Sequence, residues 1–152
     1  MANASGSADR DDPYDLTRFT RAQDKVYADV LAELRGGQKL THWMWFIFPQ
    51  IDGLGYSSTA KFYAIKSKDE TKAYLNHSLL GPRLIECSKV LLQHQGLSAS
   101  DIFGFPDDLK LRSSMTLFAT VSEPDSVFSR VLGQYFEGQP DDRTLELLRQ
   151  ES

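Results

Sequence analysis

The sequence predicts an all-α protein, a compact irregular bundle of about six to eight helices in a single domain. Apolar residues recur at intervals of three and four along most of the chain, and no segment shows the alternation of a half-buried strand. A chain of 152 residues, 41% of them hydrophobic, is long enough for one core, whereas two independent domains would each be marginal.

The first element is expected only after a disordered N-terminal arm, residues 1–13, which is rich in Ala, Ser, Gly and Asp and has little to bury. The all-α domain then covers residues 14–152. Its first helix is predicted from Leu16 to Arg35, where apolar side chains share one seam and Gly36–Gly37 ends the helix. Gln23 falls on the same face, so its amide is either satisfied by backbone groups or points into a polar cavity.

The middle of the chain is predicted to alternate short helices and loops. Thr41 is expected to cap a short helix over the aromatic block HWMWFIFPQ, which Pro49 ends. The loop GLGYSS follows, and one of its serines caps a short helix through Tyr63. Ser67 caps a further helix that has acidic residues in its first turn.

The second half of the chain is also predicted to be helical. A helix begins near Gly81–Pro82 and carries an apolar stripe that includes Cys87, which we expect to be a small buried hydrophobe rather than a nucleophile. After the loop ASDIFGFPDD, one helix runs from about Asp107 into TLFATV and another covers Asp125 to Phe136. The segment DDRTLELLRQ forms the last helix, capped by one of its two aspartates.

Charge and composition narrow the class of protein. The formal net charge of −4 argues against a nucleic-acid-binding surface but leaves room for a cationic patch around a small anionic ligand. One cysteine and three histidines without metal-ligand spacing predict no metal site and no internal disulfide. We see no secretion signal and no membrane-spanning run. We therefore expect a cytoplasmic protein with no membrane partner and no cofactor, and leave its oligomeric state open.

Three polar clusters interrupt the apolar pattern, and each has two interpretations. His42 and Gln50 flank the aromatic block, where His42 is either an acid–base group or a structural hydrogen-bonding residue. The glycines and serines of GLGYSS either let backbone N–H groups approach an anion or form a simple turn. In FGFPDDLKLRSSMT, Asp107 and Lys110 lie one helical turn apart, and so do Lys110 and Ser113 or Ser114. That face either holds a ligand, with Ser114 as the serine we select, or forms an ordinary exposed ion pair.

The aromatic block leads to a geometric prediction. Trp43 and Trp45 lie two residues apart, so on a helix their side chains point about 200° away from each other. Either the segment is buried all round, or one indole is core and the other lines a pocket. We also expect the loops 53–58 and 103–114 to pack together, with Lys110 and Ser114 facing GLGYSS across a cleft.

Several segments are similar to those of one known family: RFTRAQ at 18–23, HWMWFIFPQ, GLGYSS, KFYAI at 61–65, AYLNH at 73–77, LLGPRL at 79–84, IFGFPDDLKLRSSMTLF at 102–118 and YFEGQPDDRTLELL. Over about residues 16–148 the sequence resembles the bacterial domain of unknown function 1810. This resemblance implies no established reaction. Some members carry the name calpastatin, which implies a protease inhibitor. Calpastatins are long disordered chains, whereas this chain has the apolar stripes of a compact domain, so we do not expect that function.

A looser similarity links the chain to the α-helical NADAR superfamily, whose members act on N-glycosidic bonds of nucleotide or ADP-ribose derivatives. The shared pattern is a Gly-containing loop, a short helix bearing Phe62 and Tyr63, and a later hydrophobic helix. Residues 60–63 hold no glutamate at the place where that superfamily has its characteristic acid.

The sequence thus predicts a polar pocket that binds a nucleotide-like or other anionic small molecule, with N-glycosidic hydrolysis as the reaction that the looser similarity implies. The alternative is a noncatalytic protein-interaction module, in which the aromatic block is core or a partner-facing patch. The candidate catalytic residues are His42 and Asp107. The candidate ligand-binding residues are Gln23, Trp43, Trp45, Gln50, Gly53, Gly55, Tyr56, Ser57, Lys61, Lys110 and Ser114.

Overall fold

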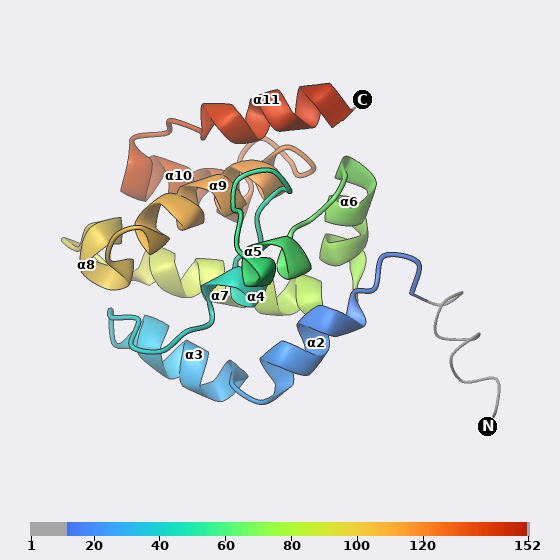
Figure 1. Ribbon diagram of the computed structural model, residues 1–152. Helices are drawn as coiled ribbons and strands as arrows, with labels where there is room; N and C mark the ends of the chain where they lie inside the picture. The colour runs from blue at the N-terminus through green and yellow to red at the C-terminus, as the bar shows by residue number, and fades with distance from the viewer. Residues whose placement is uncertain (1–11, 152) are drawn as a thin grey trace.

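The computed structural model describes residues 12–151, which form ten α-helices and no strand (Figure 1). In chain order the helices are α2 (Thr17–Asp24), α3 (Tyr27–Arg35), α4 (Met44–Ile47), α5 (Ser58–Tyr63), α6 (Lys68–Asn76), α7 (Leu80–Gln93), α8 (Ala99–Phe103), α9 (Asp107–Ala119), α10 (Val127–Phe136) and α11 (Asp142–Glu151). The prediction of a compact all-α domain is confirmed.

The number of helices exceeds the six to eight expected, for two reasons. The single helix predicted from Leu16 to Arg35 is broken at Val26, whose φ of −128° and ψ of −3° are not helical. The break lets α2 pack against α4 while α3 packs against α7. In addition, part of the predicted loop after Gly96 forms α8, which Ser98 and Asp101 start with a capping box.

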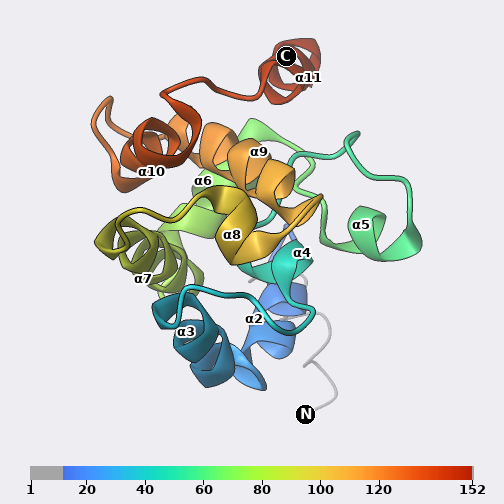
Figure 2. The ribbon, with the colours of Figure 1, turned by 90° about the vertical axis from the view of Figure 1, so that its left-hand side faces the viewer.

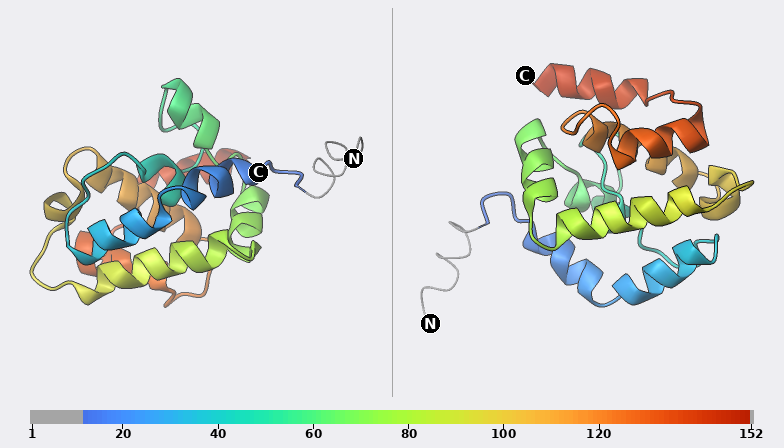
Figure 3. Two further views of the ribbon diagram at one scale, coloured as in Figure 1. Left: turned by 90° about the horizontal axis from the view of Figure 1, so that it is seen from below. Right: turned by 180° about the vertical axis from the view of Figure 1, so that it is seen from behind.

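Two helices organise the core. Helix α7 runs along the rear of the domain and packs against α3, α6 and α10 (Figure 3, right). Helix α9 packs against α8, α10 and α11. The predicted stripe of α7 is buried, and burial raises the pKa of the Cys87 thiol to about 12. Cys87 is therefore a core side chain, as predicted. A thiol with so high a pKa is a poor nucleophile.

Residues 52–63, the α5 loop, stand out from the bundle (Figures 2 and 3, left). None of these residues is buried. The base of the loop is closed by a parallel bridge between Ile51 and Ile65, in which the Ile65 N–H donates to the Gln50 carbonyl at 2.8 Å. Ser57 caps α5 by accepting from the Ala60 N–H at 3.1 Å, as predicted.

The predicted N-terminal arm falls mostly on residues 1–11, which lie outside the described residues. Asp12 is described, and its carboxylate accepts the N–H groups of Leu16 at 2.6 Å and Thr17 at 2.9 Å. Asp12 thus belongs to the folded part and caps the start of α2. No helix within residues 12–151 combines the length and the apolar character needed to cross a bilayer.

Candidate functional site

A cleft of about 420 Å³ separates the α5 loop from the first turns of α9. It is lined by Trp45, Gln50, Leu54, Gly55, Tyr56, Ser57, Ala60, Pro106, Leu109, Lys110 and Ser113. A second, smaller pocket of about 20 Å³ shares Trp45, Gln50 and Gly55 with the cleft and is also lined by Tyr63 and Ala64. The prediction that residues 53–58 and 103–114 face each other across a cleft is therefore confirmed.

The cleft gathers six of the side chains and backbone segments proposed from the sequence: Trp45, Gln50, Gly55, Tyr56, Ser57 and Lys110. Ser114 does not join them, because it is fully buried, and the neighbouring Ser113 lines the cleft instead. Successive residues of a helix point about 100° apart, so only one of the two serines can face the cleft. Within residues 12–151 the Ser114 hydroxyl has no hydrogen-bond partner.

Two other proposed residues are structural. Trp43 is only 1% exposed and donates its Nε1–H to Glu33 Oε1 at 2.9 Å, so it is a core residue and not a stacking surface. The Gln23 amide donates to the Phe46 carbonyl at 2.7 Å and to the Tyr74 hydroxyl at 3.0 Å. Because these partners satisfy the amide inside the bundle, Gln23 faces no polar cavity.

Three further candidates lie outside the cleft lining. His42 and Lys61 are exposed, and neither lines the cleft. Gly53 has a φ of +108° and lies under Leu147, whose Cδ2 would be 3.1 Å from an added Cβ. The glycine is needed there for backbone conformation and for the close approach of α11, rather than for contact with a ligand.

The charge of the cleft comes from a charge triad of Lys39, Asp107 and Lys110. Asp107 Oδ1 lies 3.3 Å from Lys110 Nζ, and Asp107 Oδ2 lies 2.9 Å from Lys39 Nζ. The Lys110 ammonium also lies over the Trp45 ring, 4.7 Å from its centroid. Asp107 is not among the lining residues, so it serves as an ion-pair partner rather than as an acid or base facing the cleft.

The loop that carries Lys39 and Trp43 is held by one carboxylate. Glu33 accepts the Leu40 N–H at 2.7 Å, the Thr41 hydroxyl at 2.7 Å and the Trp43 indole at 2.9 Å. Burial alone would raise the pKa of Glu33, but these hydrogen bonds outweigh it and lower the pKa to about 2. Thr41 therefore anchors this loop and does not cap α4, which has no side-chain cap.

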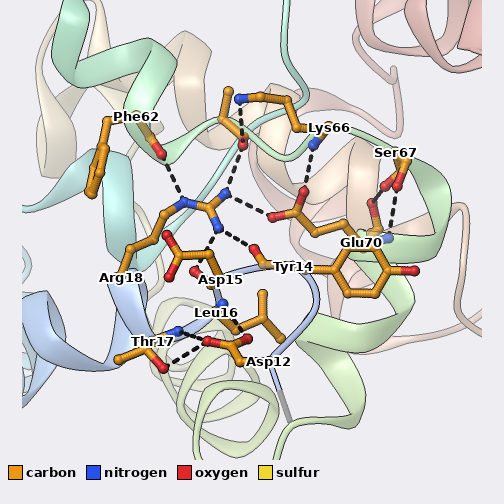
Figure 4. A network of polar contacts seen from close by, with 12 residues as sticks. Asp12, Tyr14, Asp15, Leu16, Thr17, Arg18, Phe62, Lys66, Ser67 and Glu70 are labelled. Carbon is orange, nitrogen blue, oxygen red and sulfur yellow. Dashed lines mark hydrogen bonds and ion pairs between the residues drawn. The ribbon is translucent and has the colours of Figure 1, made fainter. Parts of the chain in front are cut away.

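The wall of the cleft that the α5 loop forms is held by Arg18, a residue that sequence reasoning did not single out (Figure 4). All five of its N–H groups donate. The acceptors are the carbonyl oxygens of Tyr14 (2.7 Å), Asp15 (2.8 Å), Phe62 (2.8 Å) and Ala64 (2.9 Å), and Glu70 Oε2 (2.8 Å). The side chains of Arg18 and Glu70 are 7% and 3% exposed. This buried pair ties the end of the α5 loop to α2 and α6.

Sequence reasoning also missed Lys39 and Leu109, and of the two serines one turn from Lys110 it selected Ser114 instead of Ser113. Leu109 and Ser113 lie four residues apart on α9, and residues at that spacing share one face of a helix. The spacing could therefore have placed Leu109 on the same wall as Ser113. Lys39 carried no such signal, since its partner Asp107 is distant in the sequence. Among the described residues, no group of three or more His, Cys, Asp and Glu side chains is placed to hold a metal ion.

Residues 13–148 match the family described as Protein of unknown function (DUF1810), and the chain belongs to that family. The fold is similar to the crystal structure of the conserved hypothetical protein Rv1873 from Mycobacterium tuberculosis, with 53% sequence identity and a TM-score of 0.88. The similarity covers 90% of this chain and 98% of that one. No curated protein matches the chain. The family and fold expected from the sequence are thus confirmed.

Proposed function

We propose that the cleft between the α5 loop and α9 binds a small anionic molecule with a planar ring, of which a nucleotide is the model. The observation that carries this proposal is the pairing of Lys110 with Trp45, whose ring centroid lies 4.7 Å from Nζ inside the cleft. A cation and an aromatic face are therefore available to one ligand. Pockets of this kind combine apolar walls with a few polar groups that fix orientation.

The ring would lie against Trp45 or Tyr56. Trp45 is half-buried, and Tyr56 is 83% exposed although it is a large aromatic residue. Stacking of a base on an aromatic side chain contributes about 1–3 kcal/mol. An exposed tyrosine at the mouth of a cleft is consistent with a recognition role, since its ring stabilises no core.

The anionic group would lie between Lys110 and the α5 loop. The backbone N–H groups of Gly55, Tyr56 and Ser57 donate to no described residue, and neither does the Gln50 amide. These donors all belong to residues that line the cleft. Together with one lysine they form a set of groups that favour negative charge.

Binding is better supported than hydrolysis. Among the described residues that line the cleft there is no carboxylate and no imidazole. Enzymes that cleave glycosidic bonds generally use carboxyl groups to activate water or to stabilise the sugar cation. Asp107, the acid proposed from the sequence, is not among the lining residues and is paired with Lys39 and Lys110. The described lining therefore supplies groups for recognition but neither of the carboxyl groups that such enzymes use.

A protein-interaction module is the second candidate, and one observation favours it. Leu109 lines the cleft and is 49% exposed, and Phe105, next to the lining residue Pro106, is 79% exposed. Tyr56, on the other wall, is exposed as well. Exposed apolar patches of this kind often mark contact sites. Loss of a protein contact in Phe105→Ala, with no small molecule bound by the wild type, would favour this function instead.

The proposal is tested by a thermal-shift screen against AMP, ATP, NAD, ADP-ribose and ribose 5-phosphate, followed by calorimetric titration. A ligand that binds the folded state raises the melting temperature by mass action. We expect Lys110→Ala to weaken binding about tenfold, the equivalent of about 1.4 kcal/mol. Lys61→Ala is the matched control, because Lys61 is exposed and lies outside the lining. Absence of binding, or equal affinity in the two variants, would contradict the proposal.

A further inference from the structure

We infer that Lys39, which does not line the cleft, sets the affinity of the cleft for anions by sharing the Asp107 carboxylate with Lys110. The inference rests on the proposed function and assigns it a specificity-determining residue. Its basis is the arrangement of the charge triad, in which one carboxylate lies between two ammonium groups and carries one oxygen toward each.

The two contacts of Asp107 are unequal. The contact with Lys39 measures 2.9 Å and that with Lys110 measures 3.3 Å. The Lys39 side chain is 8% exposed, against 25% for Lys110. Coulomb attraction grows as charges come closer and as water is excluded. Lys39 therefore neutralises the larger share of the Asp107 charge, and Lys110 keeps the surplus positive charge on the cleft side.

Lys39 is held in place by the core and not by the cleft. Its backbone N–H donates to the Ile102 carbonyl at 2.7 Å, and its ammonium lies over the Trp43 ring, 5.2 Å from the centroid. Trp43 is in turn fixed by Glu33. Each lysine of the triad thus has its own tryptophan, Trp43 on the core side and Trp45 on the cleft side, with Asp107 between them.

The triad carries a net charge of +1, because two ammonium groups meet one carboxylate. Without Lys39, Asp107 would direct its whole charge at Lys110, and an incoming anion would compete with that carboxylate. Without Asp107, both lysines would attract the anion unopposed. Removal of Lys39 and removal of Asp107 therefore have opposite effects, which would not arise if Asp107 itself bound the ligand.

The experiment titrates AMP and adenosine into the wild type, Lys39→Gln, Asp107→Asn, the double variant and Lys110→Ala at low ionic strength. We expect Lys39→Gln to weaken AMP binding about tenfold and Asp107→Asn to tighten it about threefold. The double variant again has a net triad charge of +1, so its affinity should return close to that of the wild type. Adenosine is uncharged, so its affinity should be the same in Lys39→Gln and Asp107→Asn as in the wild type.

Lys72→Gln is the matched control, since Lys72 is exposed on α6 and its loss changes the net charge of the protein by the same amount. AMP binding should not change in this variant. If Lys39→Gln does not fold, the comparison of Asp107→Asn with the double variant tests the inference, because equal AMP affinity in those two would overturn the role of Lys39.

The possible failures are distinct. If AMP binding depends on Lys110 but is equal in the wild type, Lys39→Gln and Asp107→Asn, the role of Lys39 is overturned while the proposed function stands. Weaker AMP binding in Asp107→Asn would likewise overturn it, because that result makes Asp107 a ligand contact. If AMP does not bind the wild type at all, the proposed function is contradicted and this inference with it.

Discussion

The two walls of the cleft are built in different ways. On one side, α9 from Leu111 to Phe118 is buried except for Arg112, which is half-buried. On the other side, no residue of the α5 loop is buried, and its position depends on backbone hydrogen bonds at its base and on the Arg18 side chain. Lys110 belongs to the first wall, whereas Tyr56 and Ser57 belong to the second.

The difference shows how the groups that we propose for recognition are placed on this domain. Packing holds the α9 wall as part of the core, so Lys110 starts from a rigid position. A segment with few buried contacts opens at low free energy, so we expect the α5-loop wall to be displaced more easily than the α9 wall. Binding residues are often carried on loops that a rigid scaffold positions, and the proposed role of the α5 loop agrees with that rule.

The largest expected effect separates the two tryptophans of the aromatic block. Trp43→Ala should lower the free energy of unfolding by about 3–5 kcal/mol, because it removes a buried aromatic side chain. Trp45→Ala should cost clearly less and should instead weaken ligand binding, since Trp45 is half-buried and lines the cleft. Urea denaturation and calorimetric titration measure the two quantities. Equal, large losses of stability would mean that both indoles are core.

Arg18→Met should have the next largest effect, about 3 kcal/mol, because it leaves the buried Glu70 carboxylate without its charged partner. The same variant should speed hydrogen exchange in the α5 loop, whose end Arg18 holds through Phe62 and Ala64. Arg21→Met is the control, because Arg21 lies on the same helix and is exposed. Unchanged exchange in the loop would show that Arg18 does not position this wall.

A smaller effect on the free energy of unfolding should appear in acid, where Glu33 becomes protonated. The folded-state pKa of Glu33 is about 2, below its ordinary value of 4.5. The stabilisation from Glu33 is therefore fully present above about pH 4.5 and is lost as the pH falls toward 2. The difference in unfolding free energy between the wild type and Glu33→Gln should shrink over that interval. A difference that is independent of pH between 5 and 2 would contradict this assignment.

The smallest effect on stability should come from the mouth of the cleft. Tyr56 is 83% exposed, so Tyr56→Ala should change the free energy of unfolding by no more than about 0.5 kcal/mol. AMP binding should nevertheless weaken severalfold. Leu79→Ala removes another exposed apolar side chain, on the surface next to α7, and should affect neither quantity. If both variants bind AMP as the wild type does, Tyr56 takes no part in recognition.

The sequence by itself determined the fold class and most of the helices. Apolar periodicity located α7, α9 and α10, and the capping signals at Ser57 and Ser67 located the starts of α5 and α6. It also located both sides of the cleft, because glycines, serines and a lysine interrupt apolar segments there. These signals are readable because helix periodicity and capping depend on residues only a few positions apart.

Only the tertiary structure decided which side chains face the cleft. Trp43 rather than Trp45 is core, and Ser113 rather than Ser114 is on the wall, because the rotation of each helix depends on the elements packed against it. The partners of Arg18 and Lys39 were equally hidden, since Arg18 meets Glu70 across 52 positions of sequence. Such pairs form only when the folded core brings distant segments together, so no local pattern of residues predicts which side chains will pair.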